Sequence, residues 1–337
     1  MTREIEVTGN SRIYIGRAEE LLQQLLPSGR VIVISDSNID RTHHSLIANF
    51  EHILIGQGEQ AKSLATLDEI YRKLIEMGAD RSSFILGVGG GIVTDVAGFV
   101  ASTYMRGVKF GFVTTTLLGA VDASVGGKNG VNIGGFKNMV GTFSQPQFVV
   151  CDASLLGSLP VREFRAGLAE VIKTAILGDA ELFSILEKST FDELRSNSTL
   201  LDEVITRCVK VKASVVAEDE REGGRRRILN LGHTIAHAIE KSSNKLNHGE
   251  AVAVGLHHIT RSALTQNLIS ENDAKRIFAI LEQYGFDVES PADHKQLLKA
   301  IEGDKKRSGN SLHLIYPTAI GAVTDRSVEY NELAEAL

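Results

Sequence analysis

The order of apolar and polar residues divides the chain into two patterns, and the first covers roughly its N-terminal half. Short apolar runs of the kind that buried strands give alternate there with stretches of helical periodicity. The runs are Val31–Ser35, Phe84–Val88, Phe110–Val113 and Phe148–Cys151, and the helical stretches are Leu64–Met77 and Ile92–Ser102. Strands that alternate with helices predict βαβ units and a mostly parallel sheet.

From about Ser154 onward, long helical patterns replace this alternation, and glycines separate them. They cover Arg162–Leu177, Leu200–Ala217, Thr234–Lys241, Glu250–Gln266, Asn272–Tyr284 and His294–Glu302. We therefore expect a Rossmann-like α/β nucleotide-binding domain over residues 1–153 and an all-α domain over residues 154–337.

Composition excludes several classes of protein. A length of 337 residues favours two domains, and a net charge of −6 argues against a nucleic-acid partner. No apolar run approaches the length of a membrane span. Cys151 and Cys208 lack CxxC spacing, and the start MTREIEVTGN lacks the apolar segment of a signal peptide. We expect a cytoplasmic protein without a disulfide framework.

The segment GVGGGIVTD lies between a predicted strand and a predicted helix. Gly87 and Gly89 match the first two glycines of a dinucleotide fingerprint, but Ile92 stands where the third should be. Glycines at such a place let the backbone approach a pyrophosphate at a helix N-terminus. A tight strand-to-helix turn explains the same residues equally well.

Polar segments near these strands strengthen the nucleotide hypothesis. Asp36 follows the first strand, where an acid can bind ribose hydroxyls, and Thr115-Thr116 follow the strand Phe110–Val113. Glu59 and Lys62 belong to a polar loop before a helix. Because ligands of open α/β sheets bind at the carboxyl ends of the strands, these residues are candidates for one crevice.

Histidines and a glutamate in the helical half form a candidate metal set. His233 and His237 are four residues apart on one predicted helix and share a face, and His248 begins the next helix. Glu170, His233 and His248 together give the His₂Glu set of a catalytic zinc with an open coordination position. Spacing alone leaves alternatives open. His233 and His237 could be two histidines with ordinary hydrogen-bond partners, Glu170 could lie on a solvated helix face, and His248 could be an ordinary residue at a helix N-terminus.

The segment Val125–Asn138 is dense in glycine and carries Lys128, Lys137 and Asn138. Glycine backbone N–H groups and ammonium groups can converge on an anion such as phosphate. Further cations that could join such a pocket, or equally be surface charges, are Arg106, Lys173, Lys212, Arg226 and Lys305.

Taken together, these motifs resemble the 3-dehydroquinate synthase family of the sugar-phosphate cyclases. The resembling segments keep the family's order and spacing from SDSN near residue 35 to DKK at 304–306. They are GEQAKS, GGGIVTDVAGFVASTYMRG, TTLLGAVDASVGGKNGVN, FKNMVGTFSQP, LPVREFRAGLAEVIK, KASVVAEDE, LNLGHTIAHAIE and HGEAVAVG.

The resemblance implies a dehydroquinate synthase-like fold and a phosphate-eliminating lyase of the shikimate pathway. Such an enzyme converts 3-deoxy-D-arabino-heptulosonate 7-phosphate to 3-dehydroquinate and phosphate. It does so by transient NAD oxidation, phosphate elimination, re-reduction and intramolecular aldol closure. The implied cofactors are NAD and Zn²⁺, with Co²⁺ as an alternative ion, and the implied assembly is a homodimer.

The resemblance also assigns roles to individual positions. The implied zinc ligands are Glu170, His233 and His248. The implied NAD contacts are Asp36, Asn38, Glu59, Lys62, Gly90, Gly91, Asp95, Thr115, Thr116, Asp122, Lys128 and Lys137. The implied substrate contacts are Lys128, Asn138, Lys173, Lys212, Arg226, Asn230, His237 and Lys305, and Arg106 is expected to reach the site of the neighbouring subunit.

Some positions depart from the family pattern. Thr94 replaces a glycine, Thr114 replaces a common proline, and Phe136 stands where glycine is frequent. Gly119 and Ala120 replace commoner residues beside the expected nicotinamide site.

Three other functions compete with the implied one. Another sugar-phosphate cyclase would share the fold and cofactors and differ around the reacting carbons. A metal-dependent polyol dehydrogenase would form NADH and would not need Lys128, Lys137 and Lys305. A non-catalytic NAD-binding regulator would be favoured by lost ligands, but all three ligand positions are intact.

Overall fold

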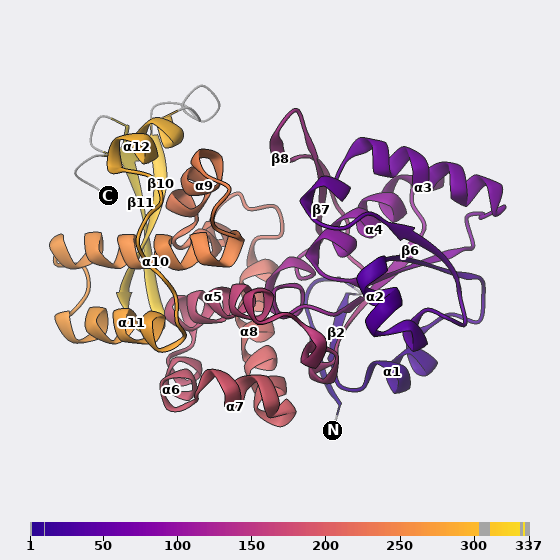
Figure 1. Cartoon of the computed structure of the whole chain (residues 1–337), viewed down its shortest axis with the longest axis horizontal. Coiled ribbons are helices and arrows are strands. Elements are labelled where there is room, and N and C mark those ends of the chain that lie inside the picture. Colours follow the sequence, from indigo (N-terminus) through magenta and orange to yellow (C-terminus); the bar gives the residue numbers. More distant parts are fainter. Residues whose placement is uncertain (1, 10, 303–310, 331–332, 334–337) are drawn as a thin grey trace. The chain divides into compact units, whose positions relative to one another are not determined.

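The computed structural model describes residues 2–9, 11–302, 311–330 and 333, and these form two compact units (Figure 1). The first unit comprises Met1–Phe164 and Asn197–Arg221, and the second comprises Arg165–Ser196 and Glu222–Leu337. The helix α8 (Ser198–Glu218) thus groups with the first unit, although it follows the boundary expected after residue 153.

A seven-stranded sheet forms the centre of the first unit, in the order β1-β2-β9-β6-β5-β3-β4. Only the edge strand β1 is antiparallel to its neighbour, so the prediction of a mostly parallel sheet is confirmed. The strands are β1 (Arg3–Glu6), β2 (Arg12–Ile15), β3 (Val31–Asp36), β4 (Glu51–Ile55), β5 (Phe84–Gly89), β6 (Lys109–Thr114) and β9 (Phe148–Cys151).

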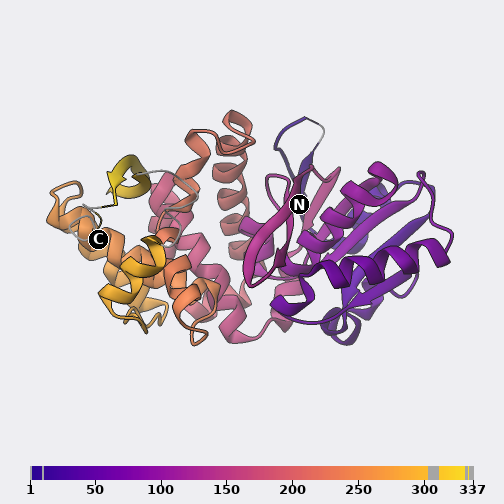
Figure 2. The same ribbon diagram turned by 90° about the horizontal axis from the view of Figure 1, so that it is seen from above.

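Helices cover both faces of this sheet (Figure 2). Val33 and Leu86 belong to a buried cluster that includes Leu21 of α1 on one face. On the other face, a Cβ at Gly87 would lie 2.9 Å from the Cβ of Ala97 in α4, so this helix packs directly on β5. The helices are α1 (Ala18–Leu25), α2 (Ser37–Thr42), α3 (Leu64–Glu76) and α4 (Gly91–Thr103), with the short turns η1 (His44–Leu46), η2 (Glu59–Ala61), η3 (Tyr104–Arg106), η4 (Gly119–Ala123) and η5 (Ala153–Ser158).

The glycine-dense segment after residue 125 forms an antiparallel hairpin of β7 (Lys128–Ile133) and β8 (Phe136–Phe143). We identified this segment only as a candidate anion site and predicted no strands in it. The buried side chain of Asn129 donates hydrogen bonds to the carbonyl groups of Gly127 and Ser144 and ties down the base of the hairpin. Most residues of β8 are exposed, so no apolar alternation marks this hairpin in the sequence.

The second unit is mostly helical. The six helices predicted after residue 154, including α8 of the first unit, are confirmed to within two residues at each end. The elements are α5 (Val161–Gly178, which begins in the first unit), α6 (Ala180–Lys188), α7 (Phe191–Ser196), η6 (Arg225–Asn230), α9 (His233–Ser242), α10 (His248–Thr265), α11 (Glu271–Gln283) and α12 (His294–Glu302). Among the described residues, no helix has the length and apolarity needed to cross a bilayer.

The prediction that this half is all-α is wrong in one respect. The strands β10 (Ser311–Ala319) and β11 (Ala322–Glu329) form an antiparallel hairpin. Leu314, Ile315 and Tyr316 are consecutive and all buried. A short continuous apolar run has no period of two, and periodicity therefore does not distinguish it from a helical segment.

Candidate functional site

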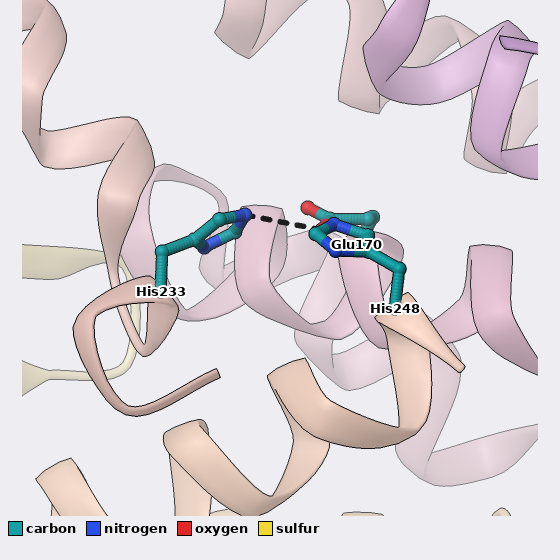
Figure 3. Close-up of side chains that lie close together, drawn as sticks. All are labelled: Glu170, His233 and His248. Atoms are coloured by element: carbon teal, nitrogen blue, oxygen red, sulfur yellow. Dashed lines mark hydrogen bonds and ion pairs between the residues drawn. The ribbon is translucent and has the colours of Figure 1, made fainter. Parts of the chain in front are cut away.

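The candidate metal ligands meet within the second unit, each from a different helix. Glu170 lies in α5, and His233 and His248 are the first residues of α9 and α10. Figure 3 shows the three side chains pointing toward one another. Oε1 of Glu170 lies 3.5 Å from Nε2 of His233 and 3.2 Å from Nε2 of His248. A tetrahedral zinc with bonds of about 2.1 Å separates its ligand atoms by roughly 3.4 Å, so the set fits this ion.

Two glycines explain how these helices come so close. A Cβ at Gly249 would lie 2.2 Å from the carbonyl oxygen of Ala166, one turn before Glu170 in α5. A Cβ at Gly255 would lie 2.1 Å from the carbonyl oxygen of Gly232, which precedes His233. Only glycine permits backbone contacts of this kind, and α10 is thereby held against the segments that carry the other two ligands.

Glu170 remains ionised although it is fully buried. Burial by itself raises the pKa of this carboxyl, but the charge of Lys173 and the interactions with the His233 and His248 rings outweigh it and hold the pKa well below its usual range. Lys173, one turn further along α5, is also buried and forms an ion pair with Glu170. The site therefore contains a carboxylate that is ready to bind a cation.

The two histidines present the same ring nitrogen to Glu170. Burial and the charge of Lys173 lower the pKa of His233 to about 3. Its ring is therefore neutral, with Nδ1–H donating to the Leu231 carbonyl at 3.1 Å and Nε2 left as a metal ligand. Burial also favours neutral His248, but hydrogen bonds with Glu170 and Glu240 outweigh it and raise the pKa of this ring to about 10. A divalent ion would take the place of that proton.

Three other predicted substrate contacts lie close to His233, one in the same helix and two in the short helix η6 that precedes it. The ring of His237 lies with its centroid 5.5 Å from that of His233. Arg226 is buried in η6, and Asn230 at the end of η6 donates to Oε1 of Glu222 at 2.7 Å. Lys305 lies outside the described residues.

In the first unit, five of the predicted NAD contacts lie at the carboxyl edge of the sheet. Asp36 ends β3, Gly90 and Gly91 follow β5, and Thr115 and Thr116 follow β6; these three strands are adjacent and parallel. The Thr115 N–H donates to the Gly89 carbonyl at 3.0 Å. A Cβ at Gly90 would lie 2.8 Å from Cγ2 of Thr116, so the two loops are in close contact.

Asp36 also has a local structural role, because its carboxylate accepts hydrogen bonds from the N–H groups of Asn38 and Ile39 and caps α2. Buried Lys62 forms an ion pair with Asp95, whose side chain is 18% exposed. Burial raises the pKa of Asp95 to about 6, although the charge of Lys62 opposes the shift.

Asn132 connects two of the predicted segments and was missed in the sequence. Its Nδ2 donates to Oε1 of Glu59 at 2.7 Å, and its Oδ1 accepts from the N–H of Asn138 at 2.9 Å. Asn138 has a left-handed backbone with φ of 54°, and this hydrogen bond supports it.

The remaining predicted residues of the first unit lie in three places. Lys212 of α8 donates to both the carbonyl oxygen and Oδ1 of Asp122, each at 2.6 Å. Lys128 and Lys137 are exposed on the hairpin. Arg106 is exposed at the end of η3 with φ of 70°, in the left-handed region that costs free energy for a residue with a side chain.

The departures from the family pattern are accommodated locally. The Thr94 hydroxyl donates to the Gly91 carbonyl at 3.0 Å within α4, and that of Thr114 donates to the Val150 carbonyl at 3.3 Å. Gly119 donates its N–H to Oγ1 of Thr116 at 3.0 Å. Ala120 is buried and Phe136 is largely exposed.

Comparisons with known proteins identify the family. The family model of the 3-dehydroquinate synthase N-terminal domain matches residues 52–166, and that of the C-terminal domain matches residues 167–307. The chain belongs to the 3-dehydroquinate synthase family. It is 38% identical over 336 residues to the 3-dehydroquinate synthase of Alkaliphilus metalliredigens (strain QYMF), covering 96% of this chain and 94% of that relative. Identity to the synthase of Pelobacter propionicus (strain DSM 2379 / NBRC 103807 / OttBd1) is 42% over 305 residues, covering 87% of this chain and 85% of the relative.

Solved structures of related cyclases have the same fold. A 2-deoxy-scyllo-inosose synthase in complex with carbaglucose-6-phosphate, NAD⁺ and Co²⁺ has a TM-score of 0.86 at 27% identity, over 100% of this chain and 99% of its own. The 2-epi-5-epi-valiolone synthase of Streptomyces hygroscopicus subsp. jinggangensis 5008, with NAD⁺ and Zn²⁺ bound, has a TM-score of 0.88 at 26% identity, over 99% and 96%. An iron-containing alcohol dehydrogenase, at a TM-score of 0.66 and 14% identity over 98% and 97%, shares the fold alone.

Proposed function

We propose that this chain is a 3-dehydroquinate synthase that converts 3-deoxy-D-arabino-heptulosonate 7-phosphate to 3-dehydroquinate and phosphate. The observation that carries this proposal is the convergence of Glu170, His233 and His248 in a member of this family. Loss of one ligand would have favoured a non-catalytic NAD-binding protein, but all three are present and their ligand atoms lie within 4.8 Å of one another.

The cofactors are NAD and Zn²⁺, with Co²⁺ as an alternative ion. When bound, Zn²⁺ would supply Lewis acidity for a substrate hydroxyl, and NAD⁺ would supply a reversible hydride acceptor with no net redox change. Glu170, His233 and His248 hold the metal. Gly90 and Gly91 allow the backbone to approach the cofactor at the N-terminus of α4. The other proposed NAD contacts are Asp36, Asn38, Glu59, Lys62, Asp95, Thr115, Thr116, Asp122, Lys128 and Lys137.

The substrate carries a phosphate and a carboxylate, and the chain supplies groups that neutralise them. These proposed contacts are Lys128, Asn138, Lys173, Lys212, Arg226, Asn230, His237 and Lys305. Fixed cations beside a leaving phosphate stabilise the charge that develops during elimination. The substrate phosphate itself can accept the proton, so no strong protein base is required. His237 and Asn230 bind the phosphate or take part in proton transfer.

The assembly and location are part of the same proposal. The enzyme is a cytoplasmic homodimer in which Arg106 of one protomer reaches the site of its partner, and the left-handed backbone at Met105 and Arg106 supports a role for this turn. Cys151 and Cys208 are buried, and neither forms a disulfide with the residues that the structure describes, as suits a reducing compartment. Functionally, residues 1–153 bind NAD and residues 154–337 bind the metal and most of the substrate.

An assay with two simultaneous readouts tests this function. Purified protein is incubated with NAD⁺, Zn²⁺ and the heptulosonate phosphate while phosphate release and NADH absorbance are followed together. We expect catalytic phosphate release without net NADH. Net NADH from simple polyols would indicate a dehydrogenase instead, and phosphate release from glucose 6-phosphate or a heptulose 7-phosphate alone would indicate another cyclase.

A further inference from the structure

The helix α9 carries more than the ligand His233. His233, His237 and Glu240 are spaced by four and three residues, so they follow one face of the helix over two turns. The Glu240 side chain is only 9% exposed, and its Oε1 lies 3.4 Å from Nδ1 of His248, which belongs to the next helix. Glu240 therefore contacts the ring of one metal ligand from the helix that supplies another.

Both ligand histidines have the ring nitrogen opposite the metal site engaged, but with different partners. Nδ1 of His233 lies 3.1 Å from the neutral Leu231 carbonyl oxygen, whereas Nδ1 of His248 faces the Glu240 carboxylate. A hydrogen bond at Nδ1 fixes the tautomer that leaves Nε2 as the ligand, and a carboxylate partner also makes Nε2 a stronger donor to the metal.

The difference between the partners matches the difference in packing of the two rings. The side chain of His233 is 11% exposed, and that of His248 is 32% exposed. Surrounding side chains restrict the more exposed ring less, so its orientation depends more on hydrogen bonds at its two nitrogens. One of those nitrogens faces the metal ligand Glu170, and Glu240 is the partner of the other.

We propose that Glu240 is a positioning residue that orients His248 and strengthens it as a metal ligand. The proposal rests on the proposed metal site, and Glu240 acts through His248 without binding the metal itself. The helix α9 then has two roles: its first residue binds the metal, and its last turn aligns the ligand that α10 contributes.

The variant Glu240→Gln keeps the size of the side chain and removes its charge. We expect the zinc affinity of the full-length protein, measured by competition with a chromophoric chelator, to fall about 10- to 100-fold. The visible absorption bands of the Co²⁺-loaded variant should also shift from those of the wild type. The melting temperature of the metal-free protein should also fall somewhat, because the charge of Glu240 stabilises protonated His248 when no metal is bound. The loss of zinc affinity and the shifted Co²⁺ bands are the readouts that a purely structural role would not move.

Glu187→Gln is the matched control. Glu187 is also a helical glutamate of the second unit, but it pairs with Arg276 through two hydrogen bonds of 2.8 and 2.7 Å. This control should keep wild-type zinc affinity and Co²⁺ bands. Wild-type zinc affinity in Glu240→Gln, or a lower melting temperature of the metal-free variant with unchanged affinity, would overturn the proposal.

A second measurement needs no variant at Glu240. In the zinc-loaded wild type with ¹⁵N-labelled histidine, we expect His248 to bind the metal through Nε2 and to keep a slowly exchanging proton on Nδ1. A proton on Nδ1 that exchanges as fast as that of an exposed histidine would contradict the proposal. If the wild type binds no zinc at all, it is the proposed function that fails.

Discussion

The two units of the molecule hold their candidate residues in different ways. In the second unit, helix-to-helix backbone contacts hold the metal ligands so that they already point toward one another. Metal binding therefore needs no rearrangement of these side chains and only the loss of a proton from His248. In the first unit, the candidate NAD and substrate residues lie at a sheet edge, on a hairpin and on α8. Several of them already have partners: Lys62 pairs with Asp95, Lys212 pairs with Asp122, and Glu59 accepts a hydrogen bond from Asn132, which was not a candidate.

This difference indicates how each region responds to its ligand. A metal ion adds bonds to a preformed set of donors, so loss of one donor should be severe. A cofactor or substrate that binds in the first unit exchanges existing hydrogen bonds for new ones, so single changes there should have smaller effects.

The largest expected effect comes from removal of a metal ligand. His248→Ala leaves two of three ligands and should lower turnover at least about a thousandfold, because the Lewis acid is lost. Zinc content after dialysis and the rate of phosphate release are the measurements. A variant with full zinc content and the wild-type rate would show that His248 is not a ligand.

A smaller but still large effect should follow from disturbing the helix contacts that bring the ligands together. A Cβ in Gly255→Ala would meet the Gly232 carbonyl oxygen, so α10 must shift at a cost of about 1–3 kcal/mol in the free energy of unfolding. Zinc affinity should fall with it. Urea unfolding and a zinc titration measure both quantities.

Gly157→Ala is the control for this comparison, because an added Cβ there meets nothing within 4 Å. It should leave the stability and zinc affinity near those of the wild type. If the two alanine variants had the same stability and zinc affinity, the close contact at Gly255 would not explain how the three helices converge.

The elements were more predictable than their convergence. Long periodic helices and buried parallel strands have apolar patterns that depend on local burial, and these appear in the sequence. Glu170 is 63 residues before His233, and their meeting depends on contacts at Gly249 and Gly255 that no local pattern reveals. Glu240 did leave a signal, since it continues the helical spacing of His233 and His237.

The two hairpins and the role of Asn132 were not predicted, and each was missed for a physical reason. The strand β8 is mostly exposed, so burial imposes no alternation on it, and β10 has a continuous apolar run. Asn132 acts through hydrogen bonds to Glu59 and Asn138. Nothing in the composition of a glycine-rich segment indicates that one of its asparagines makes such hydrogen bonds.

A moderate effect is expected at the cofactor edge of the first unit. The Cβ of Gly90→Ala would press on Cγ2 of Thr116, and NAD⁺ affinity should fall about tenfold because the backbone loop must move. Thr116→Ser removes that methyl group, so the double variant should recover part of the affinity. Zinc affinity should be unchanged in both, because Gly90 and Thr116 supply no metal ligand. A fall in zinc affinity would contradict a local effect on the cofactor loop.

The smallest predicted effect is a pH dependence from Asp95. Its folded pKa of about 6 lies above the ordinary value of 3.8, so the folded state binds the proton more tightly than the unfolded state. Stability should therefore fall as the pH rises from about 4 to 6, and the unfavourable contribution is complete above pH 6. Asp95→Asn should lack this fall when its urea unfolding is followed across the same pH range. Parallel pH profiles for the two proteins would contradict the assignment to Asp95.

The most direct test of the metal centre is to remove the ion and return it in measured amounts. The protein is stripped with EDTA, the chelator is dialysed away, and phosphate release from the heptulosonate phosphate is measured as Zn²⁺ is added. We predict no turnover without metal and a linear return of activity that ends at one equivalent of zinc per chain. Full activity of the metal-free protein would contradict the account.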